Sequence, residues 1–200
     1  MPSYPCIRFI AVAATGMDCI DLDACSDRGI VVSNIRNWSV SVAEHVFALL
    51  LTLRRNLLAY HSEVQSGAWR ESPTYTLLLE PIPLALRGST MGIIGYGSIG
   101  STVAGIAESF GIKIIIAERK DSLVIREGRH PFLEVLQKSD VLVVLCPLTE
   151  QTFGLIGDNE LREMRRHALL INCAVVESSM MRPCLRSSKM GALPVQELIF

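Results

Sequence analysis

The stretch Met91-Gly-Ile-Ile-Gly-Tyr-Gly-Ser-Ile-Gly100 decides the fold of this 200-residue chain. A short apolar run leads directly into the spacing Gly-x-Gly-x-x-Gly, and residues 98–110 then follow a helical pattern. In such a strand–turn–helix unit, Gly95 permits the tight turn, Gly97 lets a phosphate approach the backbone, and Gly100 lets helix and strand pack closely. The helix N-terminus adds amide donors and the positive end of its dipole. The motif therefore predicts a site for the pyrophosphate of a dinucleotide.

The next strand ends in an acidic residue, where dinucleotide-binding folds place one. Residues 113–117 are rich in β-branched side chains, and Glu118 follows 23 positions after Gly95. A carboxylate there accepts hydrogen bonds from the adenosine ribose hydroxyls. Glu118 favours NAD, because a carboxylate repels the 2′-phosphate of NADP, whereas Arg119 and Lys120 would attract that phosphate. We expect NAD as the cofactor, with NADP as the alternative.

Apolar strands alternate with helices along much of the chain. We expect strands at residues 8–14, 30–33, 141–145 and 168–171, and helices at 22–28, 132–138 and 159–165. Near-continuous apolar strands separated by helices indicate a parallel sheet covered on both faces. The fold class predicted is α/β, with a doubly wound parallel sheet of Rossmann type.

A long helix is expected at residues 41–60, where Ser41 and Glu44 have the spacing of a capping box. Residues 47–51 are apolar on every side of this helix, so it lies either between domains or subunits, or in an ordinary core. Residues 61–88 are richer in Gly, Pro and Ser and read as a connector that wraps the surface.

Composition excludes several classes of protein. The chain has 19 Lys+Arg against 20 Asp+Glu, which argues against nucleic-acid binding through bulk positive charge. No apolar run approaches the roughly 18 residues of a membrane span, so no membrane association is expected. The six cysteines form no CxxC pair and have no histidine at metal-ligand spacing. We therefore predict no metal site, and buried thiols in the reducing environment of the cytoplasm.

Seven ordered stretches resemble the D-isomer-specific 2-hydroxyacid dehydrogenases, particularly the glycerate dehydrogenase or hydroxypyruvate reductase branch. These stretches are Ala11-Val-Ala-Ala-Thr-Gly-Met-Asp18, Val32-Ser-Asn34, Val42-Ala-Glu-His45, Arg87 to Gly97, Ala117-Glu-Arg-Lys120, Cys146-Pro-Leu-Thr149 and Leu170-Ile-Asn-Cys-Ala174. The resemblance implies an enzyme that passes hydride between a nicotinamide and a small 2-oxo or 2-hydroxy acid. It also implies that residues 1–36 are the remnant of a flavodoxin-like substrate domain, that residues 37–174 form an incomplete NAD-binding domain, and that the chain is truncated at both ends.

The resemblance also implies roles for individual residues. Thr15 and Gly16 match a loop whose amides hold the substrate carboxylate. The residues that match positions around the cofactor are Gly95, Gly97, Ser98, Ile99 and Gly100 at the pyrophosphate, Glu118 and Arg119 at the ribose, and Pro147, Thr152 and Cys173 beside the rest of the dinucleotide.

The resemblance stops at Val175. The family has an Arg there that grips the substrate, and a Glu and an acid–base His further on; this chain has Val175, and its four histidines all precede it. We therefore assign no catalytic residue. Residues 175–200 lose the pattern, and we interpret them as a divergent tail from an altered splice or reading frame. The strand at 168–171 is then expected to end as an exposed, apolar sheet edge unless the tail covers it.

Two other functions stay open beside an oxidoreductase. One is a non-catalytic dinucleotide-binding fragment that forms a homodimer or pairs with an intact subunit through helix 41–60. The other is a corepressor-like protein that senses dinucleotide through the same fold.

Overall fold

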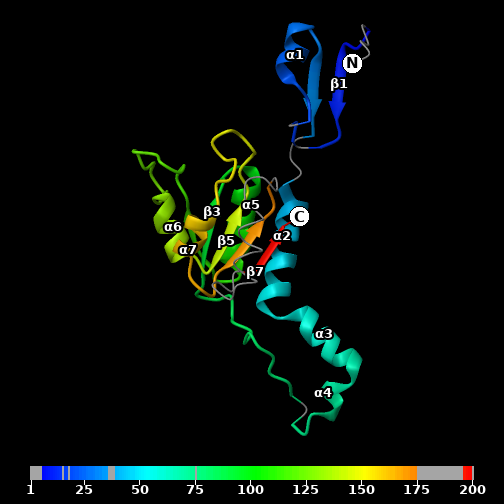
Figure 1. The fold of residues 1–200 in the computed structure, drawn as a ribbon, viewed down its shortest axis with the longest axis vertical. Helices are drawn as coiled ribbons and strands as arrows, with labels where there is room; N and C mark the ends of the chain where they lie inside the picture. The colour runs from blue at the N-terminus through cyan, green and yellow to red at the C-terminus, as the bar shows by residue number, and fades with distance from the viewer. Residues whose placement is uncertain are drawn as a thin grey trace.

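A five-stranded parallel sheet forms the centre of the computed structural model, which describes residues 6–14, 16–17, 19–35, 39–74, 76–174 and 196–199. Its strands are β3 (Thr90–Ile94), β4 (Lys113–Ile116), β5 (Val141–Val144), β6 (Leu169–Asn172) and β7 (Gln196–Ile199). Their spatial order is β4-β3-β5-β6-β7 (Figure 1). From β3 the chain first forms β4 on one side of β3 and then crosses over to form β5 on the other side. Ligands of open α/β sheets bind outside the carboxyl ends of the strands at such a reversal of strand order.

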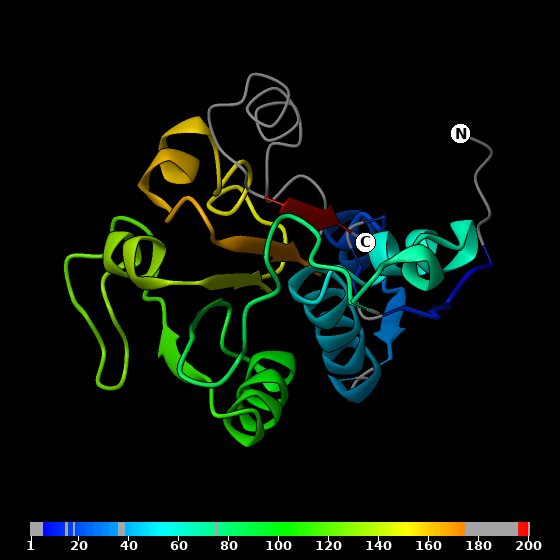
Figure 2. The ribbon, with the colours of Figure 1, turned by 90° about the horizontal axis from the view of Figure 1, so that it is seen from below.

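Helices cover both faces of this sheet (Figure 2). On one face lie α2 (Ser39–Arg54) and α5 (Ser98–Ser109), and on the other α6 (Phe132–Lys138) and α7 (Asp158–Glu163). Alternate residues of β5 belong to opposite cores: Val141 and Val143 pack with α2 and α5, while Leu142 and Val144 pack with α6 and α7. The expected doubly wound α/β fold is confirmed.

The outer edge of β6 is paired. β7 runs parallel to it, with Leu169 opposite Gln196 and Asn172 opposite Ile199. β7 belongs to the tail, so the edge at residues 168–171 is covered by the tail and is not exposed. A fully buried edge strand leaves a row of backbone donors and acceptors to satisfy, and an extended segment from later in the chain satisfies them. Backbone pairing of this kind does not require a periodic pattern of apolar side chains in the added strand, so the sequence pattern does not reveal β7.

The single helix expected at residues 41–60 is two helices. α2 begins at Ser39 and ends at Arg54, and α3 (Leu57–Ser66) starts after Asn56. Asn56 has a left-handed backbone with φ 50°, which breaks the helical path, and its side-chain Nδ2 donates to the carbonyl of Pro81. Periodicity does not reveal such a break, because asparagine tolerates the left-handed region and also fits a helix.

The connector contains more helix than expected. α3 continues to Ser66, and the short α4 (Ala68–Glu71) follows before the chain returns to β3. α2 turns one face to the core, where Ala43, Val46 and Leu50 are fully buried, and packs mainly against α5 and β6. None of the helices in the described ranges is both long and apolar enough to cross a membrane.

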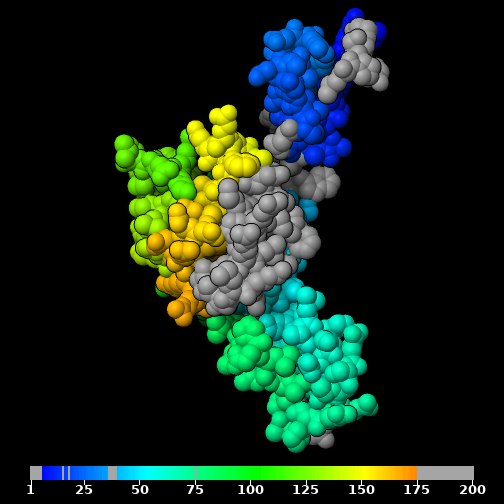
Figure 3. Space-filling model, viewed as in Figure 1, coloured from blue at the N-terminus to red at the C-terminus, as the bar shows by residue number. Residues whose placement is uncertain are grey.

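The molecule is elongated, with a smaller unit at one end and the α3–α4 arm at the other (Figures 1 and 3). The smaller unit consists of β1 (Phe9–Val12), α1 (Leu22–Asp27) and β2 (Val31–Asn34). β1 and β2 pair in parallel as a separate two-stranded sheet, and Phe9 and Val31 expose much of their apolar surface.

Candidate dinucleotide-binding site

Most of the residues expected around a cofactor follow the carboxyl ends of neighbouring strands. Gly95 directly follows β3 and Cys173 directly follows β6, while Glu118 comes two residues after the end of β4 and Pro147 three residues after the end of β5. Because these strands are parallel, the four segments lie at the same edge of the sheet. The fold thus brings together residues that are up to 78 positions apart in the chain.

The three glycines of the turn have different physical roles. Gly95 has φ 98°, and a Cβ there would lie 2.5 Å from the backbone nitrogen of Cys146. A Cβ on Gly100 would lie 2.5 Å from the carbonyl oxygen of Gly95. A Cβ on Gly97, in contrast, would project into open space. The first and third glycines therefore allow close packing, and the second leaves room beside the turn.

The start of α5 fits an anionic group. The helix begins at Ser98, Gly97 is its N-cap, and no side chain caps it. The first-turn residues Ser98, Ile99 and Gly100 therefore present amides to the space beside Gly97. No acidic residue lies in the first turn, so the dipole and these amides favour a phosphate there. The residues present fit the pyrophosphate of a dinucleotide.

Thr152 shapes the loop after β5. Its hydroxyl donates to the carbonyl of Pro147 (2.7 Å) and accepts from the amide of Thr149 (2.7 Å). These bonds hold residues 147–152 as a compact turn at the edge of the sheet. Cys173, half-buried after β6, is held as a neutral thiol because burial raises its pKa to about 11. The raised pKa makes this thiol a weaker nucleophile than a free cysteine.

Glu118 is buried and fully engaged. It is only 3% exposed, and its carboxylate accepts four hydrogen bonds. Arg126 donates from Nε to Oε2 (2.7 Å) and from Nη2 to Oε1 (2.5 Å), while the amides of Arg119 and Arg126 donate at 2.8 and 3.2 Å. The Arg126 side chain, followed by these amides, holds the pKa of Glu118 far below its usual range.

Sequence reasoning did not identify Arg126. It lies eight residues after Glu118 in an exposed loop, and only the closure of that loop brings the two together. Arg119 and Lys120 are the two cations expected to attract a 2′-phosphate. Lys120 pairs with Glu160 (2.9 Å), while the Arg119 side chain is exposed.

The substrate side of the site is described only in part. Thr15 and Val175 lie outside the described residues, and Gly16 is an exposed residue soon after β1. His130 and His167 have carboxylate partners: Glu134 lies 3.3 Å from the His130 ring, and Asp140 lies 2.9 Å from the ring of His167.

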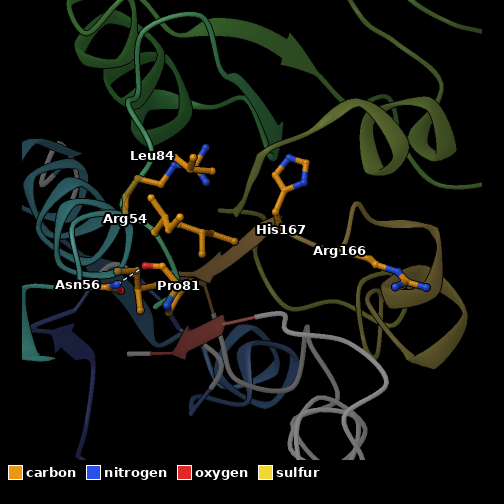
Figure 4. Close-up of a pocket in the computed structure, with 9 residues that line it drawn as sticks. Arg54, Asn56, Pro81, Leu84, Arg166 and His167 are labelled. Atoms are coloured by element: carbon orange, nitrogen blue, oxygen red, sulfur yellow. Dashed lines mark hydrogen bonds between the residues drawn. The ribbon is translucent and has the colours of Figure 1, made fainter. Parts of the chain in front are cut away.

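A cavity of about 260 Å³ lies at the opposite edge of the sheet, beside the start of β6 (Figure 4). It is lined by Leu53, Arg54, Asn56, Pro81, Ile82, Leu84, Arg166, His167 and Leu169. Arg54 is 8% exposed, and its Nε atom has no hydrogen-bond partner in the described part of the chain. Burial lowers the pKa of Arg54, and the charge of Asp140 partly offsets that shift. This cavity is separate from the dinucleotide edge.

Comparisons with known proteins agree with this geometry. A sequence model described as "D-isomer specific 2-hydroxyacid dehydrogenase, NAD binding domain" matches residues 47–192. A glycerate dehydrogenase of Methylorubrum extorquens is 38% identical over 195 residues, which are 96% of this chain and 60% of that protein.

Two solved structures are also similar to this chain. One is D-lactate dehydrogenase from Aquifex aeolicus complexed with NAD and lactic acid, with a TM-score of 0.82, 30% identity, and coverage of 96% of this chain and 58% of that one. The other is an acyclic imino acid reductase in complex with NADPH and D-Arg, with a TM-score of 0.80, 28% identity, and coverage of 96% and 62%. The chain thus spans about 60% of the length of these relatives.

Proposed function

Because the chain belongs to the D-isomer specific 2-hydroxyacid dehydrogenase family, we propose that it holds NAD(H) at the Gly95–Gly100 turn as the cofactor-binding part of a hydride-transferring oxidoreductase. The observation that carries this proposal is the turn itself: tightly packed at Gly95 and Gly100, and open beside Gly97 at an uncapped helix N-terminus.

The substrate class follows from the relatives. Two of the similar proteins act, by their names, on glycerate and on lactate, and the resemblance assigns Thr15 and Gly16 to the loop that holds a substrate carboxylate. When bound, a nicotinamide cofactor supplies or accepts the hydride. We infer a small 2-oxo acid, such as hydroxypyruvate or glyoxylate, as the group that the reaction reduces.

Turnover by this chain alone is not part of the proposal. The resemblance puts Val175 where an arginine would bind the substrate, and valine offers no planar fork of donors. His167 lies at the cavity on the opposite edge of the sheet, and His130 lies beside the outer strand β4, bridged to Ala117, so neither is assigned as the acid–base group.

The test measures NADH binding to the purified chain by fluorescence. Hydroxypyruvate is then added to the same cuvette. We expect binding without NADH oxidation. Gly97→Asp fills the open space with a charge beside the pyrophosphate and should weaken NADH binding at least tenfold. Gly105→Asp is the matched control, because Gly105 lies on α5 with equally open surroundings and should leave binding unchanged.

Each contrary result has a definite meaning. A folded wild-type chain that binds no NADH would refute the proposal, and equal loss in both variants would mean that the turn is not the site. NADH oxidation on addition of hydroxypyruvate would show that another group replaces the missing arginine and histidine.

A second function is supported by the surface of the arm. α3 has no buried residue, and Leu57, Leu58 and Val64 on it are exposed, as is Leu78 on the irregular returning segment of the connector. We propose that this arm pairs with a second copy of the chain or with an intact subunit. The five described cysteines are free thiols, which supports a location in the cytoplasm.

A further inference from the structure

The carboxylate of Glu118 has no acceptor position left for a ribose. A carboxylate offers about four lone-pair positions, and Arg126 and the two backbone amides occupy four. The hydroxyls of an adenosine ribose would have to displace at least one of these donors. The rule that an acid after the second strand selects NAD assumes a free carboxylate, and here that assumption does not hold.

Arg126, in contrast, has donors to spare. A guanidinium has five N–H donors on two forked edges. The Nε–Nη2 edge is bound to Glu118, so the Nη1–Nη2 edge remains, and no described residue accepts from Nη1. The Arg126 side chain is 53% exposed while that of Glu118 is 2% exposed. The buried carboxylate therefore fixes a guanidinium whose second edge faces solvent.

The surroundings of this edge favour an anion. The exposed Arg119 side chain lies at the start of the same loop and has no ion pair among the described residues. Lys120 is held elsewhere, by Glu160 and over the ring of Phe132. Glu118 itself is neutralised by its partner, so its repulsion of a phosphate is reduced. A planar fork of donors, with a second cation on the same loop, matches the charge and geometry of a phosphate monoester.

We propose that Arg126, held in place by Glu118, binds the 2′-phosphate of NADP(H), so that the site accepts NADP(H) as well as NAD(H). Arg126 is the specificity-determining residue, and Glu118 is its positioning residue. This inference rests on the proposed function, since it concerns the adenosine end of the same dinucleotide site.

The experiment compares the dissociation constants of NADPH and NADH for the wild-type chain and for Arg126→Met. We expect the wild type to bind both nucleotides within about tenfold of each other. Loss of a charge-assisted, two-point contact should weaken NADPH binding by about ten- to a hundredfold. NADH binding should stay within about threefold of the wild type or tighten, because acceptor positions on Glu118 become free.

Two further variants complete the design. Lys113→Met removes one positive charge at the opposite end of β4 and should leave the ratio of the two constants unchanged. Arg126→Lys keeps the charge and a partner for Glu118 but lacks the fork, so it should lose part of the NADPH affinity. It also provides the measurement if Arg126→Met, which leaves a buried carboxylate with fewer partners, fails to fold.

The outcomes distinguish a failure of this inference from a failure of the proposed function. An unchanged ratio of the NADPH and NADH dissociation constants in folded Arg126→Met and Arg126→Lys would overturn the inference. Arg126 would then only stabilise its own loop. A wild type that binds NADH but not NADPH would overturn it as well, and would leave the proposed function intact. A wild type that binds neither nucleotide would remove the proposed function itself, and this inference with it.

Discussion

Two arginines of this chain differ in whether their donors find acceptors: Arg126 is half-exposed and pairs with a buried carboxylate, whereas Arg54 is buried. Arg126 meets a carboxylate with matched geometry, so burial of Glu118 is offset by four hydrogen bonds. Arg54 is buried beside the cavity at the opposite edge, with its Nε atom unpaired in the described part of the chain. A buried donor without an acceptor loses its hydration and gains nothing in return.

Replacing Arg54 should therefore stabilise the fold. We expect Arg54→Met, which keeps the length of the aliphatic stem and removes the unsatisfied donor, to raise the free energy of unfolding by about 1–2 kcal/mol. Urea unfolding measures the change. Arg55→Met is the control at the neighbouring, exposed position and should have no effect beyond about 0.5 kcal/mol. A destabilised Arg54→Met would mean that attraction to Asp140 outweighs the cost of burial.

At the scale of elements, the packing of β3 against α6 depends on one glycine. A Cβ on Gly92 would lie 2.2 Å from Oγ of Ser139 and 2.6 Å from Cγ1 of Val135, closer than side-chain atoms approach. Both neighbours are fully buried and belong to the layer on which the sheet rests. The strand can therefore lie close to α6 only because this position has no side chain.

Gly92→Ala should destabilise the fold by about 1–3 kcal/mol, the usual cost of overpacking a core. Gly105→Ala, a glycine-to-alanine change on the exposed side of α5, should instead stabilise it by up to about 1 kcal/mol through helix propensity. Thermal unfolding of the two variants should move in opposite directions. Equal melting temperatures would contradict the close approach of β3 and α6.

Sequence patterns predicted those elements whose signals are local. The strand before Gly95, the helix from Ser98 and the acid at Glu118 each follow from a few adjacent residues. The break at Asn56 was missed because one left-handed residue does not alter hydropathy periodicity. The contact between Glu118 and Arg126 was missed because it depends on how an eight-residue loop closes, which no local pattern encodes.

At the scale of the whole molecule, the arm exposes a group of apolar side chains at a distance from the sheet. The arm formed by α3, α4 and the returning connector extends from one end of the body (Figures 1 and 3). Leu58 on this arm is 73% exposed, and Leu57 and Leu78 are also exposed. Neighbouring apolar side chains left in water on a projecting element are typical of a surface that another protein covers.

We expect the purified chain to self-associate through this arm, and Leu58→Glu to shift it toward the monomer. A charge at that position would have to be buried without a partner in the associated state, which should weaken association by at least tenfold. Sedimentation velocity over a range of concentrations measures the shift.

Leu123→Glu is the matched control, since Leu123 is 100% exposed on the loop between Glu118 and Arg126, on a different part of the body. If Leu123→Glu dissociates the chain and Leu58→Glu does not, the contact lies at the cofactor loop and the arm is not the interface. If the wild type and both variants sediment as monomers, the arm does not mediate self-association, and its partner would have to be an intact subunit of the family. Mixing the wild-type chain with such a subunit would then have to produce a complex that Leu58→Glu fails to form.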